Sequence, residues 1–126
     1  MTTINNNINI KTFLTNNLFI IGQYLQITIP YDIILTSYKL QGVFDKVIPT
    51  SWYICGSNDG ILFNVLDYQN LTTLSKISVT NFTILKTNIS LIPYNIIRII
   101  ITATTDDRNT FAIGKFIIRY KTYICF

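Results

Sequence analysis

The apolar residues of this chain fall into short runs, each closed by a turn signal after roughly ten residues. In the run 23–30, Leu25, Ile27 and Ile29 alternate with polar side chains, which is the period of a half-buried strand. Pro30 has no N–H to donate to a neighbouring strand, so this strand is expected to end there. No segment keeps a helical period, and short strands at this spacing predict an all-β sandwich or barrel. The expected strands are residues 23–30, 31–42, 51–57, 60–67, 73–85 and 92–104, and residues 111–126 are expected to form the last strand and a tail.

Two of these runs carry further expectations about burial. Within 73–85, the side chains of Ile77, Val79 and Phe82 are expected to point into the core. Residues 92–104 are almost continuously apolar, which is typical of a strand covered on both faces.

The composition favours a compact β domain. The chain is 49% hydrophobic and only 13% charged, whereas about 25% of the residues of a typical soluble domain are charged. Its apolar residues are mainly β-branched, aromatic or Leu, and the first two kinds favour strands. A length of 126 residues fits a single domain spanning 1–126. The Asn-rich start predicts that residues 1–18 form a loosely attached or docking N-terminal arm.

The net charge of +4 comes from 10 Lys and Arg against 6 acidic residues, all of them Asp. The basic residues are scattered singly, so neither a nucleic-acid groove nor a basic membrane-surface helix is expected. The first residues have no basic start followed by an apolar stretch, so no signal peptide is expected. Residues 12–31 are uncharged, but their recurring Asn, Gln and Thr argue against a transmembrane segment.

The residue types of common catalytic and metal sites are missing or badly spaced. The chain has no His, which excludes the Ser-His and Cys-His pairs of nucleophilic enzymes. Cys55 and Cys125 lack zinc spacing and are expected to be reduced and buried; a disulfide between them would need an oxidising compartment. The Asp residues lie mostly in turns, where they bond the local backbone. The sequence therefore predicts no enzyme, no metal site and no cofactor.

The stretch SWYICGSNDGILFNVLD, residues 51–67, reads as a β-hairpin. The Asn-Asp-Gly sequence at 58–60 supplies residues that tolerate a tight reversal of the chain. Because strand side chains alternate, Trp52 should share a face with Ile54 and Gly56 and fill the space between two sheets. The alternative is an exposed Trp52 that stacks on a sugar ring.

The same hairpin, extended to residues 49–67, resembles the core signature of the discoidin, or coagulation factor type C (F5/8 type C), family of galactose-binding-like domains. The matching positions are Pro49, Ser51, Trp52, Gly56 to Gly60, Phe63, Leu66 and Asp67. Residues 22–42, 94–102 and 112–120 are similar, in the same order, to other strands of that family. The resemblance implies an eight-stranded antiparallel jelly-roll β-sandwich. It also implies a structural signature formed by Trp52, Gly56, Gly60 and Arg98.

The resemblance also suggests a setting for the protein. The segment before residue 22 is short and lacks the Asp and Trp of the family's N-terminal binding loops. The Ile-, Asn-, Lys- and Tyr-rich composition is similar to that of discoidin-like domains of large DNA viruses of protists. We therefore expect a non-enzymatic structural or interaction module, a minor capsid or capsid-associated protein of the virion. Its partners would be other proteins, such as capsid proteins or copies of itself, in the virion or the host cytoplasm.

A carbohydrate-binding, lectin-like module is the alternative that the family resemblance leaves open. In such sandwiches ligands bind to the loops at one end, where aromatic faces lie beside polar groups. Membrane binding through the apolar loop tip formed by Val43 and Phe44 is a further option. The candidate ligand-binding residues are Phe44, Asp45, Lys46, Asn58, Asp59, Asp106, Asp107 and Arg108.

Overall fold

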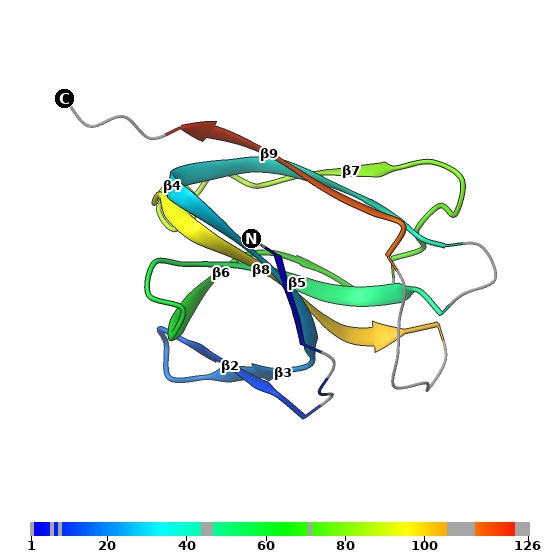
Figure 1. Ribbon diagram of the computed structural model, residues 1–126, viewed down its shortest axis with the longest axis horizontal. Coiled ribbons are helices and arrows are strands. Elements are labelled where there is room, and N and C mark those ends of the chain that lie inside the picture. Colours follow the sequence, from blue (N-terminus) through cyan, green and yellow to red (C-terminus); the bar gives the residue numbers. More distant parts are fainter. Residues whose placement is uncertain are drawn as a thin grey trace.

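The computed structural model describes residues 2–5, 7, 9–43, 47–70, 72–105 and 113–122. Within these ranges the chain forms nine strands and no helix, which confirms the all-β prediction (Figure 1). The strands are β1 (Thr2–Asn5), β2 (Lys11–Leu14), β3 (Phe19–Ile21), β4 (Gln23–Gln41), β5 (Pro49–Ser57), β6 (Leu62–Gln69), β7 (Thr80–Thr83), β8 (Tyr94–Thr104) and β9 (Lys115–Thr122).

The strands join into one curved sheet with the order β1-β4-β8-β5-β6-β2-β3, and β7 and β9 also pair with β4. All pairs are antiparallel except β2 with β6, which is parallel. The expected arrangement of eight antiparallel strands is therefore not reproduced. The sheet is mixed because β2 and β6 run in the same direction, with Phe13 opposite Leu62 and Leu14 opposite Phe63.

Strand β4 belongs to both layers of the fold. Its first part, up to Thr28, pairs with β1 and β8. Its second part, from Ile33, pairs with β9 and β7, and Ile33 also pairs with Tyr94 of β8. This second part lies across the core from β5 and β8 (Figure 1). The prediction that Pro30 ends the strand is wrong, because Pro30 lies in the irregular stretch between Thr28 and Ile33, where the register shifts and no ladder bond is needed.

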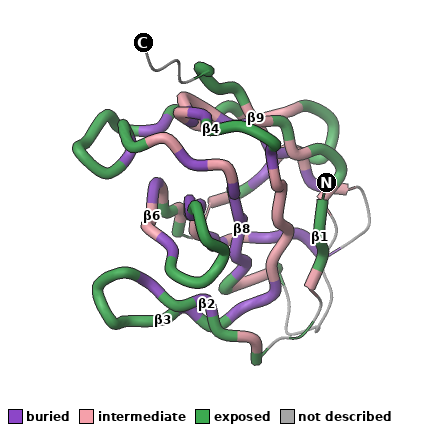
Figure 2. Tube along the Cα trace, turned by 60° about the vertical axis from the view of Figure 1, so that its left-hand side comes forward, coloured by how far each residue is buried: buried purple, intermediate pink, exposed green. Residues whose placement is uncertain are grey.

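The main core lies between the two layers. It contains Trp52 and Ile54 of β5, Tyr38 and Leu40 of β4, and the odd-numbered isoleucines of β8. A second cluster lies on the opposite face of β8, beneath the β2–β3 hairpin, and includes Cys55 and Phe63. Strand β8 is thus buried on both faces, as its apolar run predicts (Figure 2).

The run 73–85 differs from its prediction. Only Thr80–Thr83 form a strand, and Ile77 is 87% exposed. The Ser75 hydroxyl accepts the N–H groups of Ile77 and Ser78, and this local turn takes the place of strand pairing. Phe82 packs against the main core, as expected.

The described part of the segment 1–18 is paired with the sheet. β1 lies along β4 from Thr2 to Asn5, and β2 lies between β3 and β6. Leu14 is buried in the second core cluster, so this segment contributes to the hydrophobic core.

Candidate functional site

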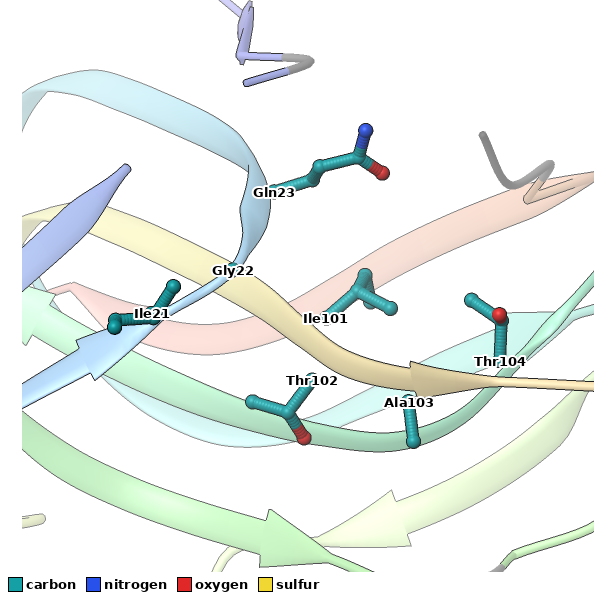
Figure 3. Close-up of a pocket in the computed structure, with 7 residues that line it drawn as sticks. All are labelled: Ile21, Gly22, Gln23, Ile101, Thr102, Ala103 and Thr104. Atoms are coloured by element: carbon teal, nitrogen blue, oxygen red, sulfur yellow. The ribbon is translucent and has the colours of Figure 1, made fainter. Parts of the chain in front are cut away.

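A pocket of about 270 Å³ opens where the turn from β3 to β4 meets the end of β8 (Figure 3). A Cβ on Gly22 would lie 2.3 Å from the carbonyl oxygen of Ile101, so glycine is required for this close approach. None of the seven residues drawn carries a charge, and a threonine hydroxyl alone is a weak nucleophile. We therefore find no acid–base or nucleophilic chemistry among the residues that line this pocket. They are Ile21, Gly22, Gln23, Ile101, Thr102, Ala103 and Thr104.

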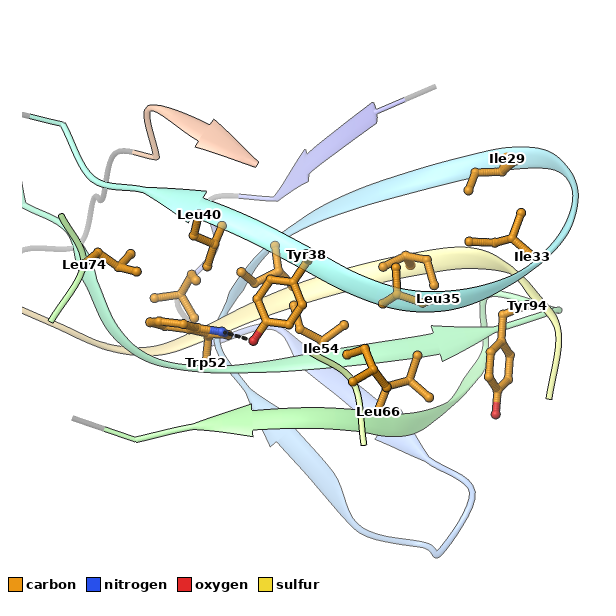
Figure 4. Close-up of a cluster of buried hydrophobic side chains, with 14 of the residues drawn as sticks. Ile29, Ile33, Leu35, Tyr38, Leu40, Trp52, Ile54, Leu66, Leu74 and Tyr94 are labelled. Carbon is orange, nitrogen blue, oxygen red and sulfur yellow. Dashed lines mark hydrogen bonds between the residues drawn. The ribbon is translucent and has the colours of Figure 1, made fainter. Parts of the chain in front are cut away.

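Trp52 is fully buried, which favours its structural role over sugar stacking. Its indole N–H donates to the hydroxyl oxygen of Tyr38 at 3.0 Å (Figure 4), and the Tyr38 hydroxyl donates to the Asp67 carboxylate. Burial, and then the bond to Asp67, raise the pKa of Tyr38. The three groups hold β4, β5 and β6 together across the core.

Gly56 lies on the same strand as Trp52, and a side chain at position 56 would not fit. A Cβ at this position would lie 2.6 Å from the ring of Tyr94. The Tyr94 hydroxyl donates to the carbonyl oxygen of Ile89, and it accepts the amide N–H of Asn64. Gly56 therefore makes room for a tyrosine that joins β8 to β6.

The tip of the hairpin is a turn whose polar groups bond to one another. The Asp59 carboxylate accepts the N–H groups of Ile61 and Leu62 at 2.8 and 3.1 Å. These backbone bonds, followed by the Ser57 hydroxyl, lower the pKa of Asp59. Gly60 has φ of +73°, a left-handed conformation that favours glycine.

Asn58 fastens this turn to the start of β8. Its amide N–H donates to the carbonyl oxygen of Pro93 at 2.9 Å, and its side-chain oxygen accepts the N–H of Asn95 at 3.1 Å. The predicted ligand groups of Asn58 and Asp59 are thus engaged in bonds within the protein. Phe44, Asp45, Lys46, Asp106, Asp107 and Arg108 lie outside the described residues. The loop-end glycan site stays a prediction, and a glycan array would test it.

We expect Asp59→Ala to lower the melting temperature at neutral pH, because the N–H groups of Ile61 and Leu62 lose their acceptor. Because the pKa of Asp59 is lower in the folded state, its contribution to stability is complete above the unfolded pKa of about 4. This contribution is lost as the pH falls through the folded pKa. The difference in melting temperature between wild type and variant should therefore become smaller in acid. Melting curves followed by circular dichroism over pH check this. Asp32→Ala is the control, and a gap that widens in acid would contradict the prediction.

Arg98 is a buried cation with aromatic neighbours. Its guanidinium carbon lies 3.7 Å from the ring centroid of Tyr24 and 4.2 Å from that of Phe63. It donates two bonds to the side-chain oxygen of Gln26, at 2.9 and 2.6 Å, and one to the Thr12 hydroxyl at 2.9 Å. No carboxylate pairs with it among the described residues. Arg98 therefore anchors β2 to β4 and β8, and burial lowers its pKa.

Cys55 lies opposite Arg98 in the β5–β8 register and is fully buried. Burial raises the pKa of its thiol to about 12, although nearby Arg98 opposes the rise. A protonated, buried thiol is neither a nucleophile nor a metal ligand at neutral pH. The prediction of a buried, reduced Cys55 is confirmed, and Cys125 lies outside the described residues.

An apolar sheet face stands out on the solvent side of β3, β2 and β6. The β2–β3 and β2–β6 registers place Phe13 opposite both Phe19 and Leu62, and Ile21 lies two residues beyond Phe19. These four side chains, which we call the apolar face, are each 45–52% exposed. The β2–β3 hairpin brings Phe13, Phe19 and Ile21 together, and the parallel pairing of β2 with β6 adds Leu62. The sequence does not reveal this face, because no strand is expected before residue 23 and the β2–β6 pairing joins distant residues.

Neither a family model nor a curated protein matches this chain. In the part that the structure describes, no group of three His, Cys, Asp or Glu side chains is placed to hold a metal ion. The same residues include no helix with the length and hydropathy that a membrane crossing requires.

Proposed function

We propose that this chain is a non-enzymatic interaction module that docks onto another protein through the apolar face of Phe13, Phe19, Ile21 and Leu62. The observation that carries the proposal is the exposure of these four large side chains on one patch of sheet. Burying apolar surface contributes about 25 cal/mol per Å², and contiguous exposed patches of this kind mark protein interaction sites.

The setting of the apolar face supports docking. The Phe13 and Phe19 rings contact edge to face with centroids 6.2 Å apart, and the Lys11 ammonium lies 4.7 Å from the Phe19 centroid. The opposite side of the hairpin is fixed. The Thr12 hydroxyl accepts a hydrogen bond from Arg98, and the side chains of Leu14 and Ile20 are buried. A rigid aromatic surface loses little conformational entropy when a partner covers it.

The position of β3 adds a second mode of contact. β3 ends the sheet order and pairs with no described strand except β2. A partner that covers the apolar face could therefore also add a strand along β3. The buried thiol of Cys55 and the internally bonded Asp59 are consistent with a binding rather than a catalytic role.

The wider setting that we put forward is a minor capsid or capsid-associated place in the virion of a large DNA virus, with a fold of the discoidin jelly-roll type. The resemblance of residues 49–67 to the discoidin signature and the composition support it. In this setting the partner is a capsid protein, and its apolar surface covers Phe13 and Phe19.

The proposal predicts that the protein, purified from its native source, co-fractionates with a large assembly. Phe13→Ser together with Phe19→Ser should release it as a free monomer, because two aromatic anchors are lost. Ile77→Ser together with Leu85→Ser is the matched control, since these residues are 87% and 76% exposed elsewhere, and it should stay bound. Recovery of the wild-type protein as a free monomer would contradict the proposal. Recovery as a defined oligomer would identify the partner as a second copy.

A further inference from the structure

A larger pocket lies where the loop after β7 rises from the second part of β4, away from the apolar face. Its volume is about 550 Å³, within the usual range for small-molecule sites. Ile34 and Leu35 of β4 and Ile84 and Leu91 of the loop supply apolar lining. Such a surface suits an alkyl chain.

Two lysines complete the lining of this pocket. Lys86 belongs to the loop and Lys121 to β9, and no acidic residue is among the nine that line the pocket. Neither ammonium group forms an ion pair with any described residue. An apolar cavity with two cations whose charge is not balanced by the described lining favours a ligand with an anionic group.

The surrounding sheet face strengthens the positive field at this pocket. In the β4–β9 register Lys121 lies opposite Ile34, Arg119 opposite Ser37 and Lys115 opposite Gln41, so the three cations share the outer face. Lys39 of β4 lies on the same face, opposite Ile117. Asp32 is the one acidic residue of β4, and β7 and β9 have none. Alternation along β9 thus places three cations on one face, and the pairing of β9 with β4 adds Lys39; we call these four residues the basic face.

The loop that closes the pocket is held by its own hydrogen bonds. The Ser90 hydroxyl donates to the carbonyl oxygen of Leu85 at 2.8 Å and accepts the N–H of Thr87 at 2.7 Å. The N–H of Ile84 donates to the carbonyl oxygen of Thr36 on β4 at 3.0 Å. The pocket is therefore formed before any ligand arrives, which lowers the entropic cost of binding.

We propose that this pocket binds a single-chain amphiphile with an anionic head group. The alkyl chain packs against Ile34, Leu35 and Leu91, and the head group accepts hydrogen bonds from Lys86 and Lys121. This activity goes beyond protein docking and uses the other layer of the fold.

The test is a fluorescence titration of the full chain with cis-parinaric acid, a fluorescent long-chain fatty acid, followed by competition. We expect saturable binding, displacement by dodecyl phosphate, and displacement by dodecanol that is weaker by about tenfold or more, because dodecanol has no charge for the lysines. Lys86→Gln together with Lys121→Gln should weaken binding of the fatty acid by about tenfold or more.

Three variants make the result specific. Lys11→Gln together with Lys76→Gln removes the same charge away from the pocket and outside the basic face, since Lys76 lies beside Gln41 at the other end of the second part of β4, and should leave the affinity unchanged. Leu91→Asp places a carboxylate in the lining and should abolish binding; Leu91 is exposed, so the fold should persist. Phe13→Ser together with Phe19→Ser should bind the fatty acid like wild type, so this test and the docking test fail independently. No saturable binding, equal displacement by dodecanol, or full affinity of the Lys86 and Lys121 variant would overturn the proposal.

Discussion

Replacing Trp52 with alanine is expected to lower the free energy of unfolding by about 3–5 kcal/mol, the usual cost of removing a buried aromatic side chain. Trp52 is fully buried between the layers and contacts the ring of Phe82 at a centroid distance of 5.4 Å. The variant leaves a cavity that strands on both sides are too constrained to fill. It also removes the indole N–H that donates a hydrogen bond to the Tyr38 hydroxyl.

Urea unfolding followed by circular dichroism measures this effect, since the chain has one tryptophan and the variant loses that fluorescence signal. Leu85→Ala is the matched control, because Leu85 is 76% exposed and its loss should change stability by less than about 0.5 kcal/mol. A Trp52 variant as stable as the control would show that the indole does not pack between the layers.

Arg98→Ala is expected to cost about 3 kcal/mol, because one buried and one partly buried acceptor lose their donor and two aromatic rings lose the cation between them. The acceptors are Gln26 and Thr12, and the rings are Tyr24 and Phe63. Thr12 belongs to β2, so the loss should fall most heavily on the β2–β3 hairpin. Hydrogen exchange should show faster exchange of the amides of β2 and β3 than of β8.

Arg98→Met separates packing from charge at the same position. Methionine keeps a long apolar side chain between the rings and removes the cost of burying a charge that no described carboxylate balances. We expect this variant to be more stable than Arg98→Ala by about 1 kcal/mol or more. Equal stability of the two variants would show that the hydrogen bonds of Arg98, rather than its packing, hold the hairpin.

The parts of the fold that were predicted from sequence depend on local patterns. Trp52 and Ile54 share a buried face because strand side chains alternate, and β8 is apolar throughout because both its faces are covered. The turn at 58–60 follows from the backbone preferences of Asn, Asp and Gly. Each of these features is decided within a few residues of the chain.

The parts that were missed depend on pairing between distant strands. Strand β4 runs through Pro30 because its partners change at that point, which the sequence of β4 alone does not reveal. Leu62 joins the apolar face only through the parallel register of β2 with β6, and Lys39 joins the cations of β9 only through the register of β4 with β9. The prediction that Ile77 is buried in a strand is wrong for a local reason. The apolar periodicity favours a strand there, but the Ser75 hydroxyl accepts the N–H of Ile77 in a turn.

The long strand β4 also has a consequence for how the protein folds. Its two parts pair with β1, β8, β7 and β9, so strands from across the described chain depend on this one element. Most of these contacts join residues far apart in sequence, a topology that slows folding because long loops must close first. During synthesis β4 leaves the ribosome well before β8 and β9, and it lacks these two partner strands until they have been made. The two layers should therefore form late and together, in a single cooperative step.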